Sequence, residues 1–255
     1  MKIFTLTKTK ILVMFSCVLL GAIAVGIGVR TTTKLVATAA QERDIPIYCV
    51  NRDDNKVSIS FDAAWGNEQT ETLLKILKEK NVKATFFLVG DWVDKYPESV
   101  KLIAKAGHDV ENHSDTHPYM TQLSFDEQKS QLAACNEKIK ALTGKAPTLF
   151  RPPYGDYNNS VVKATKELNM YCTQWDIDSL DWKDPTPAQM VQRITSKLTS
   201  GSIILMHNGA KNTPEALPMI IDAVRAEGYE FVPISELILE GDYTTDFEGR
   251  MHLSE

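Results

Sequence analysis

From Lys56 onward, short apolar runs rich in β-branched residues alternate with longer stretches of helical periodicity. This alternation is typical of β/α units, in which parallel strands are buried on both faces by the helices that connect them. Strands are predicted at residues 57–61, 84–89, 108–112, 148–151, 171–176, 202–206 and 230–233. Helices are predicted between them, over residues 68–80, 97–106, 124–142, 159–168, 187–199 and 214–227.

These elements predict an α/β fold, a distorted (β/α) barrel of about seven parallel strands that is closed or nearly closed. The alternative is an open doubly wound sheet, which would normally carry a glycine-rich phosphate turn after its first strand. Here that turn reads Asp-Ala-Ala-Trp-Gly over residues 62–66, which offers no cradle for a phosphate. The barrel is therefore the preferred prediction.

The first 30 residues differ from the rest of the chain. Lysines 2, 8 and 10 precede an uncharged apolar run from Ile11 to Val29. At about 1.5 Å per helical residue, this run approaches the ~30 Å hydrocarbon thickness of a bilayer. It predicts one transmembrane anchor, with the lysines in the cytoplasm and the remaining chain outside the cell membrane. A cleaved signal peptide of a secreted protein is the alternative, because residues 37–39 (Ala-Thr-Ala) resemble a signal peptidase site.

The expected organisation has four parts. Residues 1–30 form the cytoplasmic N-terminus and membrane segment, and residues 31–52, polar and without periodicity, form a tether. A single large α/β domain is expected over residues 53–240, followed by a C-terminal tail over residues 241–255. The three cysteines beyond the apolar run, at positions 49, 135 and 172, have no zinc or redox spacing, which indicates buried or free thiols.

The charge balance of the 255-residue chain excludes one class of partner. It carries 28 Lys and Arg against 33 Asp and Glu, a formal net charge of −5. This balance gives no basic surface, so no nucleic acid is expected as a partner. A neutral or weakly charged substrate remains compatible with the composition.

Side chains with catalytic chemistry gather where the predicted strands end, which is the face on which β/α barrels build their active sites. They are Asp62, His113 and His117, the run Arg151 to Gly155, the run Asp178 to Trp182, and His207. His113 and His117 are four residues apart, so a helical turn would point both imidazoles to one side, where they can share a metal.

Each of these residues also has an ordinary structural interpretation. An aspartate after a strand is commonly a helix cap or a turn residue, and a lone arginine is commonly an ion-pair partner. A single histidine or tryptophan is more often part of the core than of a site. Five such groups on one face of a barrel are better explained by a functional site.

The same segments resemble the five motifs of the NodB homology domain, the polysaccharide deacetylases of carbohydrate esterase family 4, over about residues 56–239. The resemblance follows the family's order along the chain. The matching runs are Ser60-Phe61-Asp62, His113-Ser114-Asp115-Thr116-His117, Arg151-Pro152-Pro153-Tyr154-Gly155, Asp178-Ser179-Leu180-Asp181-Trp182 and Leu205-Met206-His207.

The resemblance implies metal-assisted hydrolysis of N-acetyl groups on the amino sugars of a polysaccharide. It implies a divalent metal, with Zn²⁺ as the candidate, held by His113 and His117. It further implies Asp62 as general base and His207 as the acid that protonates the leaving amine.

Supporting residues are implied in the same way. Arg151 would fix Asp62, and Asp181 would orient His207 and hold it protonated. The backbone N–H of Tyr154 would help to bind the oxyanion, and Trp182 and Leu205 would wall the pocket for the acetyl methyl group.

The sequence departs from the family at one position. The family's first motif usually continues with a second aspartate, the third metal ligand, where this chain has Ala63. A catalytic zinc site normally has three protein ligands, so two histidines should bind the metal more weakly. Metal dependence, and with it catalysis, is the property that this substitution affects.

The run Ser60 to Gly66, together with the anchor, most resembles the sporulation-associated subgroup of spore-forming bacteria, which implies peptidoglycan of the spore cortex or cell wall as substrate. Two hypotheses follow. The acid and base residues favour an active deacetylase, whereas Ala63 favours a catalytically silent glycan-binding protein. A deacylase acting on another amide-bearing sugar is the third possibility. The acid and base set has little purpose in a pure binder, so the enzyme is preferred.

Overall fold

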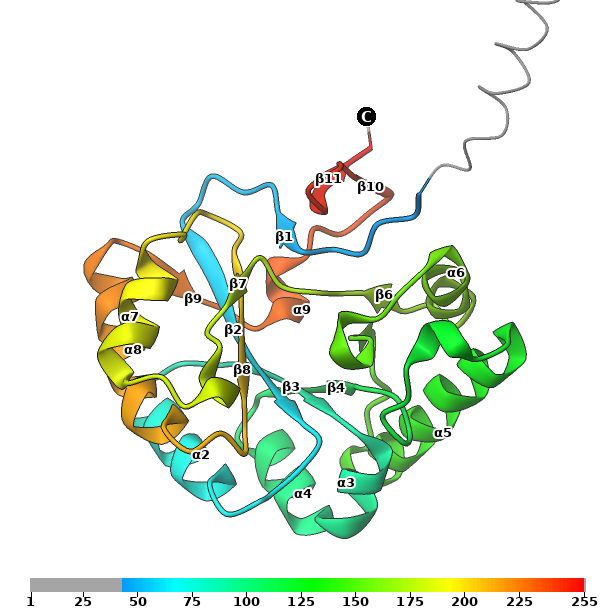
Figure 1. Cartoon of the computed structure of the whole chain (residues 1–255), viewed down its shortest axis with the longest axis horizontal. Helices are drawn as coiled ribbons and strands as arrows, with labels where there is room; N and C mark the ends of the chain where they lie inside the picture. Colours follow the sequence, from blue (N-terminus) through cyan, green and yellow to red (C-terminus); the bar gives the residue numbers. More distant parts are fainter. Residues whose placement is uncertain (1–42, 255) are drawn as a thin grey trace, which may run out of the picture. The chain divides into compact units, whose positions relative to one another are not determined.

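A parallel sheet flanked by helices forms the centre of the computed structural model, which describes residues 43–254 (Figure 1). Its strands run in the order β6-β5-β4-β3-β2-β8-β7, and β9 pairs with the start of β2. Their bounds are β2 Lys56–Ala63, β3 Thr85–Leu88, β4 Asp109–Asn112, β5 Leu149–Phe150, β6 Tyr171–Cys172, β7 Ile177–Asp178, β8 Ile203–His207 and β9 Glu230–Phe231.

All six predicted helices are confirmed, with ends that differ from the prediction by a few residues. They are α2 Thr70–Glu79, α4 Pro97–Lys105, α5 Phe125–Thr143, α6 Asn159–Glu167, α7 Pro187–Thr195 and α8 Thr213–Ala226. Capping boxes at Ser124 and Thr186 fix the starts of α5 and α7. Two short helices were not predicted, α3 Gly90–Lys95 and α9 Ile234–Leu237.

The parallel β/α architecture with seven strands in one path is confirmed, but within the described residues the sheet curls without closing. The predicted strand over residues 171–176 is in fact β6 at one edge, and β7 follows at the opposite edge. The intervening chain crosses the open side. Asp176 holds this crossing in place, because its carboxylate accepts hydrogen bonds from Ser202 Oγ and the Ile203 N–H.

A small second sheet lies beside this crossing and joins the two ends of the described chain. It consists of β1 Cys49–Val50, β11 Arg250–Leu253 and β10 Tyr243–Thr245. Ile47 bridges to Thr173, directly after β6, and Cys49 bridges to Ser202, directly before β8, so the N-terminal segment contacts the chain on both sides of the opening (Figure 1). The folded unit therefore begins at Asp44, within the expected tether, and extends through the expected tail.

Side-chain alternation along β2 separates the core from the site. Val57, Ile59, Phe61 and Ala63 belong to the main hydrophobic cluster, shared with residues of α2, α4 and α8. A strand turns successive side chains to opposite faces, so Asp62 lies on the other face with Ser58 and Ser60. The predicted transmembrane run, residues 11–29, lies outside the described residues. No helix within residues 43–254 has the length and apolar character needed to cross a membrane.

Candidate active site

A cavity of about 440 Å³ opens at the C-terminal ends of the strands, where the sequence predicted the site. Asp62, near the end of β2, is the register partner of His207, the last residue of β8. The lining residues are Asp62, Ala64, Trp65, His113, His117, Tyr154, Trp175, Asp178, Trp182, Leu205 and His207. Arg151 and Asp181 are fully buried behind this lining. All nine sequence-predicted site residues therefore belong to one constellation.

Asp62 is held by two groups. Arg151 Nη1 donates to Asp62 Oδ1 at 2.7 Å, and His113 Nε2 lies 3.5 Å from Asp62 Oδ2. Burial alone would raise the pKa of the Asp62 carboxyl, but the charge and hydrogen bond of Arg151, together with the charges of His113 and His207, outweigh this effect and leave the pKa below its ordinary value. Asp62 is consequently an anion at neutral pH.

The Arg151 guanidinium is fixed on several sides. Nη2 donates to the Gln174 carbonyl at 3.0 Å, and Cζ lies 4.1 Å from the centre of the Phe87 ring. A guanidinium stacked on an aromatic face and bonded to a carboxylate has one low-energy position. The direction of the Asp62 carboxylate is thereby determined from behind the cavity.

Asp181 holds His207 through both of its carboxylate oxygens. His207 Nδ1 donates to Oδ1 at 2.7 Å, while Oδ2 accepts from the His207 N–H at 2.7 Å and from Thr213 Oγ1 at 2.8 Å. Burial lowers the pKa of the His207 imidazole, but the hydrogen bond and charge of Asp181 outweigh burial and raise it above the ordinary value. Since Nδ1 is bonded to Asp181, Nε2 is the ring atom available for proton exchange in the cavity.

The turn from His113 to His117 is not the helical turn considered from its sequence. Ser114 and His117 have φ of 68° and 59°, in the left-handed region. Side chains replace helical hydrogen bonds: Asn112 Oδ1 accepts the Ser114 N–H, and Ser114 Oγ accepts the His117 N–H. Gln131, on α5, accepts the two N–H groups between them. The two imidazoles still meet, with ring centroids 5.0 Å apart.

The metal-binding capacity of this pair is limited by its surroundings. His113 Nδ1 donates to the Arg151 carbonyl at 2.7 Å, which leaves the Nε2 lone pair available as a ligand. Burial lowers the pKa of His113, and burial with repulsion from His113 lowers that of His117 to about 4, so both rings are neutral donors. Ala63 supplies no third donor and is packed in the core. Among residues 43–254, no group of three His, Cys, Asp or Glu side chains is placed to share a metal ion.

Aromatic side chains surround the cavity. Tyr154 is 60% exposed and stacks on Tyr119, with centroids 4.3 Å apart, while Trp182 is 52% exposed on the opposite half of the sheet. Leu205 is buried in the wall, as the sequence predicted. Tyr154 and Leu180 have positive φ, so these loops, like the histidine turn, hold strained backbone next to the cavity.

Sequence reasoning missed three contributors. Trp65 lies in the first motif run and its ring stacks on His207, but in the sequence this run served to exclude a phosphate turn and to compare subgroups, and it gave Trp65 no role in the site. Thr213 bonds to Asp181 from the start of α8, and Gln131 clamps the histidine turn from α5. Both are separated from their partners by 15 or more positions and are common residue types, so no sequence signal marks them.

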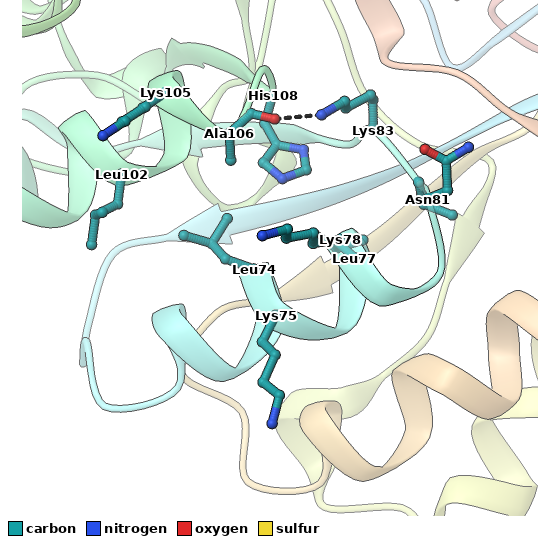
Figure 2. A pocket seen from close by; sticks show the side chains of 11 residues that line it. Leu74, Lys75, Leu77, Lys78, Asn81, Lys83, Leu102, Lys105, Ala106 and His108 are labelled. Atoms are coloured by element: carbon teal, nitrogen blue, oxygen red, sulfur yellow. Dashed lines mark hydrogen bonds between the residues drawn. The ribbon is translucent and has the colours of Figure 1, made fainter.

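A larger cavity, about 590 Å³, lies between α2 and α4, away from these residues (Figure 2). Its lining combines leucines with lysines, and Lys83 Nζ donates to the Ala106 carbonyl at the end of α4. Lysines beside helix C-termini offset the negative end of the helix dipole. This cavity therefore has a structural explanation and lacks the acid and base pair of the strand-end cavity.

Comparison with known proteins identifies this arrangement. A sequence model described as polysaccharide deacetylase matches residues 50–173. The peptidoglycan-N-acetylglucosamine deacetylase of Bacillus cereus is 34% identical over 186 residues, which cover 71% of this chain and 68% of that protein. The chain belongs to the polysaccharide deacetylase family.

Two further relatives of this deacetylase-family chain are an uncharacterised protein and a pseudoenzyme. The uncharacterised protein YlxY of Bacillus subtilis is 38% identical, over 76% of this chain and 61% of YlxY. The crystal structure of BA3943 from Bacillus anthracis, described as a family 4 pseudoenzyme, is 40% identical with a TM-score of 0.73, over 75% of this chain and 68% of that one. A mutant of BA3943 is described as having restored enzymatic activity. The chain thus spans under two thirds of the length of YlxY. The polysaccharide deacetylase family includes both active and inactive proteins.

Proposed function

We propose that the chain is a hydrolase that removes N-acetyl groups from the amino sugars of peptidoglycan, in the cell wall or spore cortex. The observation that carries this proposal is the pairing of Asp62 with Arg151 and of His207 with Asp181 on one cavity. Amide hydrolysis needs a base to activate water and an acid to protonate the leaving amine. The surroundings of the cavity favour the ionised form of Asp62 and the protonated form of His207, as these two roles require.

On the base side, the ionised Asp62 takes a proton from the attacking water as its oxygen bonds to the acetyl carbon. Arg151 keeps the carboxylate anionic and directed at the cavity, since its guanidinium is fixed by Phe87 and the Gln174 carbonyl. The negative charge that forms on the carbonyl oxygen is assigned to the backbone N–H of Tyr154, at the cavity rim.

On the acid side, the His207 imidazolium donates its Nε2 proton to the sugar nitrogen as the C–N bond breaks. Asp181 holds the ring through Nδ1 and stabilises the cation, a role that Thr213 supports by bonding the other carboxylate oxygen. The products are acetate and a free amino sugar, and the proton taken by Asp62 balances the one given by His207. Trp182 and Leu205 form the apolar wall that receives the acetyl methyl group.

We also propose that His113 and His117 bind a divalent ion such as Zn²⁺, more weakly than a three-ligand site would. The donor set is incomplete because Ala63 is an apolar core residue, so no step above depends on a metal. Calorimetric titration of the full chain with Zn²⁺, compared with His117→Ala, measures this. Equal affinity of both proteins would place the ion elsewhere.

A catalytically silent glycan-binding protein is the second candidate. Two observations favour it: the missing third donor at Ala63, and the similarity to BA3943, which is described as a pseudoenzyme. In this case the aromatic rim would hold a glycan strand without hydrolysis. An amide-bearing sugar other than peptidoglycan is compatible with either candidate.

The deciding experiment is mass spectrometry of peptidoglycan fragments after incubation with the full chain, with and without added Zn²⁺. Deacetylation appears as the loss of 42 mass units per acetyl group, about the mass difference between an acetyl group and hydrogen, and is tested by comparison with Asp62→Asn, which removes the base. Fragments left unchanged under both conditions, combined with measurable glycan binding, would support the silent candidate instead.

A further inference from the structure

Trp65 is the aromatic side chain that stacks on His207 among the described residues. The indole and imidazole centroids are 5.3 Å apart and the ring planes are inclined by 29°. Asp181 contacts the edge of the same imidazole, through Nδ1. The ring is therefore bounded on one edge by a carboxylate and on one face by an indole, and its Nε2 edge is left for the cavity.

The loops around Trp65 are built to hold this stack. A Cβ atom on Gly209 would lie 2.7 Å from both Trp65 Nε1 and Trp65 O, so only glycine permits this approach. Gly66, the residue after Trp65, has φ of 65°. Its carbonyl accepts hydrogen bonds from Trp92 Nε1 at 2.6 Å and Asn208 Nδ2 at 3.4 Å. Trp65 is nevertheless 47% exposed, so burial in the core does not account for its position.

We infer that Trp65 is a positioning residue that covers one face of His207 and, together with Asp181, fixes the direction in which Nε2 points. The inference rests on the proposed function, in which His207 is the acid. In the family's usual sequence the first motif supplies a second aspartate at the position of Ala63. Here the loop directly after β2 supplies an aromatic wall, Trp65, for the acid side of the cavity. A flat indole face also attracts a cation, so the stack favours the imidazolium.

Other charged groups act on His207 from the surrounding elements. Asp181 bonds to it, and the carboxylates of Asp62 on β2 and Asp178 on β7 raise its pKa from a distance. His113 and His117 face the same cavity. Burial lowers the pKa of each imidazole, so both rings are neutral near neutral pH. The effect of Trp65 on the pKa of His207 must therefore be measured by comparing proteins in which these three aspartates and two histidines are all unchanged.

The test is nuclear magnetic resonance of the full chain carrying ¹⁵N-labelled histidine. The sequence has five histidines, and the His207 signals are assigned by their loss in His207→Gln. In Trp65→Ala we expect the His207 titration midpoint to fall by about 0.5–1 pH unit. The Nδ1 proton should also exchange faster with water, because the ring is no longer confined. Trp65→Phe should restore most of both properties, since it keeps an aromatic face.

Trp182→Ala is the matched control. It removes another exposed indole from the same rim, but among the described residues the ring stacked on His207 is that of Trp65. It should leave the midpoint in place. An unchanged midpoint and exchange rate in Trp65→Ala, or equal shifts in Trp65→Ala and Trp182→Ala, would overturn the inference.

Acetate release measured on the same samples separates this inference from the proposed function. Trp65→Ala should lower the rate by on the order of tenfold, a partial loss of general acid catalysis. If the parent releases no acetate while the midpoint shifts, the proposed function fails and the positioning role stands. If the parent releases acetate and Trp65→Ala keeps both rate and midpoint, the positioning role fails and the proposed function stands.

Discussion

At the residue scale, the cavity holds one fixed carboxylate and one fixed imidazole, and under the proposed function each should be necessary for hydrolysis. Asp62→Asn removes the base and His207→Ala removes the acid, so each should lower acetate release by about 10² or more. Asp156→Asn, in the loop after β5 and outside the cavity lining, is the control and should keep most of the activity. Thermal unfolding of each variant verifies the fold. If both variants match the parent's rate, the assigned roles are wrong.

The dependence of activity on pH follows from the same two groups. A base works above its pKa and an acid works below its pKa. Arg151 keeps the pKa of Asp62 low against the effect of burial, and Asp181 keeps that of His207 above 6.5 against the same effect. Activity should therefore be constant near neutrality and fall on the alkaline side as His207 loses its proton.

Asp181→Asn tests this sign. Removing the carboxylate charge lowers the pKa of His207, so the alkaline fall should move to lower pH. The measurement is kcat/KM for acetate release across pH 5–10, a range chosen to contain the alkaline limb and the ordinary histidine pKa of ~6.5. A shift of the alkaline limb to higher pH would contradict the assignment of His207 as the acid.

The resemblance to a family was enough to predict the paired residues Asp62, Arg151, Asp181 and His207, because the family's motifs place them at the strand ends. It could not predict Thr213 or the stacking of Trp65, since these contacts depend on how α8 and the first loop pack. The effect of Ala63 was expected as a missing ligand. Its core position on β2 is a consequence of strand alternation that only the structure makes visible.

At the element scale, long periodic segments were predictable and short ones were not. Helix α5 is marked by its capping box and by Gly144 in the left-handed conformation after its end. By contrast, β7 has only two residues. Residues 171–176, which precede it, were predicted as one strand, but they contain the short strand β6 and the crossing of the open side. Helix α3 has six residues and begins at Gly90, a poor helix former, so no propensity signal marks it.

The contact between the N-terminal segment and β8 should be intolerant of one added carbon atom. A Cβ on Gly201, where φ is 84°, would lie 1.8 Å from the Val50 carbonyl oxygen. Gly144, where φ is 74°, is the control, because a Cβ added there would have no atom within 4 Å. Both alanine variants bear the cost of a left-handed backbone, about 1–2 kcal/mol. Gly201→Ala should be less stable by a further ~1–3 kcal/mol in urea unfolding; equal losses would show that the Val50 contact is unimportant.

At the scale of the whole molecule, the folded unit needs its N-terminal segment. Ile47 and Val50 are fully buried in a cluster that includes Met251 of β11. A fragment that begins at Lys56 loses both side chains and strand β1. At about 1.5–3 kcal/mol for each buried aliphatic side chain, the loss is roughly 3–6 kcal/mol of unfolding free energy. Differential scanning calorimetry of fragments 44–255 and 56–255 measures it, and equal melting temperatures would contradict the prediction.

The proposed location of the folded unit rests on the proposed substrate and on the first 30 residues. We propose that residues 11–29 span the membrane and that the domain lies outside it, where peptidoglycan is. Lys2, Lys8 and Lys10 precede the apolar run, and the positive-inside rule retains such residues in the cytoplasm. Protease added to intact cells should therefore remove the domain, while a cytoplasmic marker protein stays intact.

The same experiment separates anchoring from secretion. An anchored chain sediments with membranes and keeps its full mass, whereas cleavage after residues 37–39 would release a protein shorter by about 39 residues into the medium. Replacing the three N-terminal lysines with glutamate should reduce export of the domain, because orientation depends on lysine and arginine near the membrane segment. A domain that stays protected from protease in the parent strain, and becomes sensitive only after lysis, would contradict the proposed orientation and separate the site from its substrate.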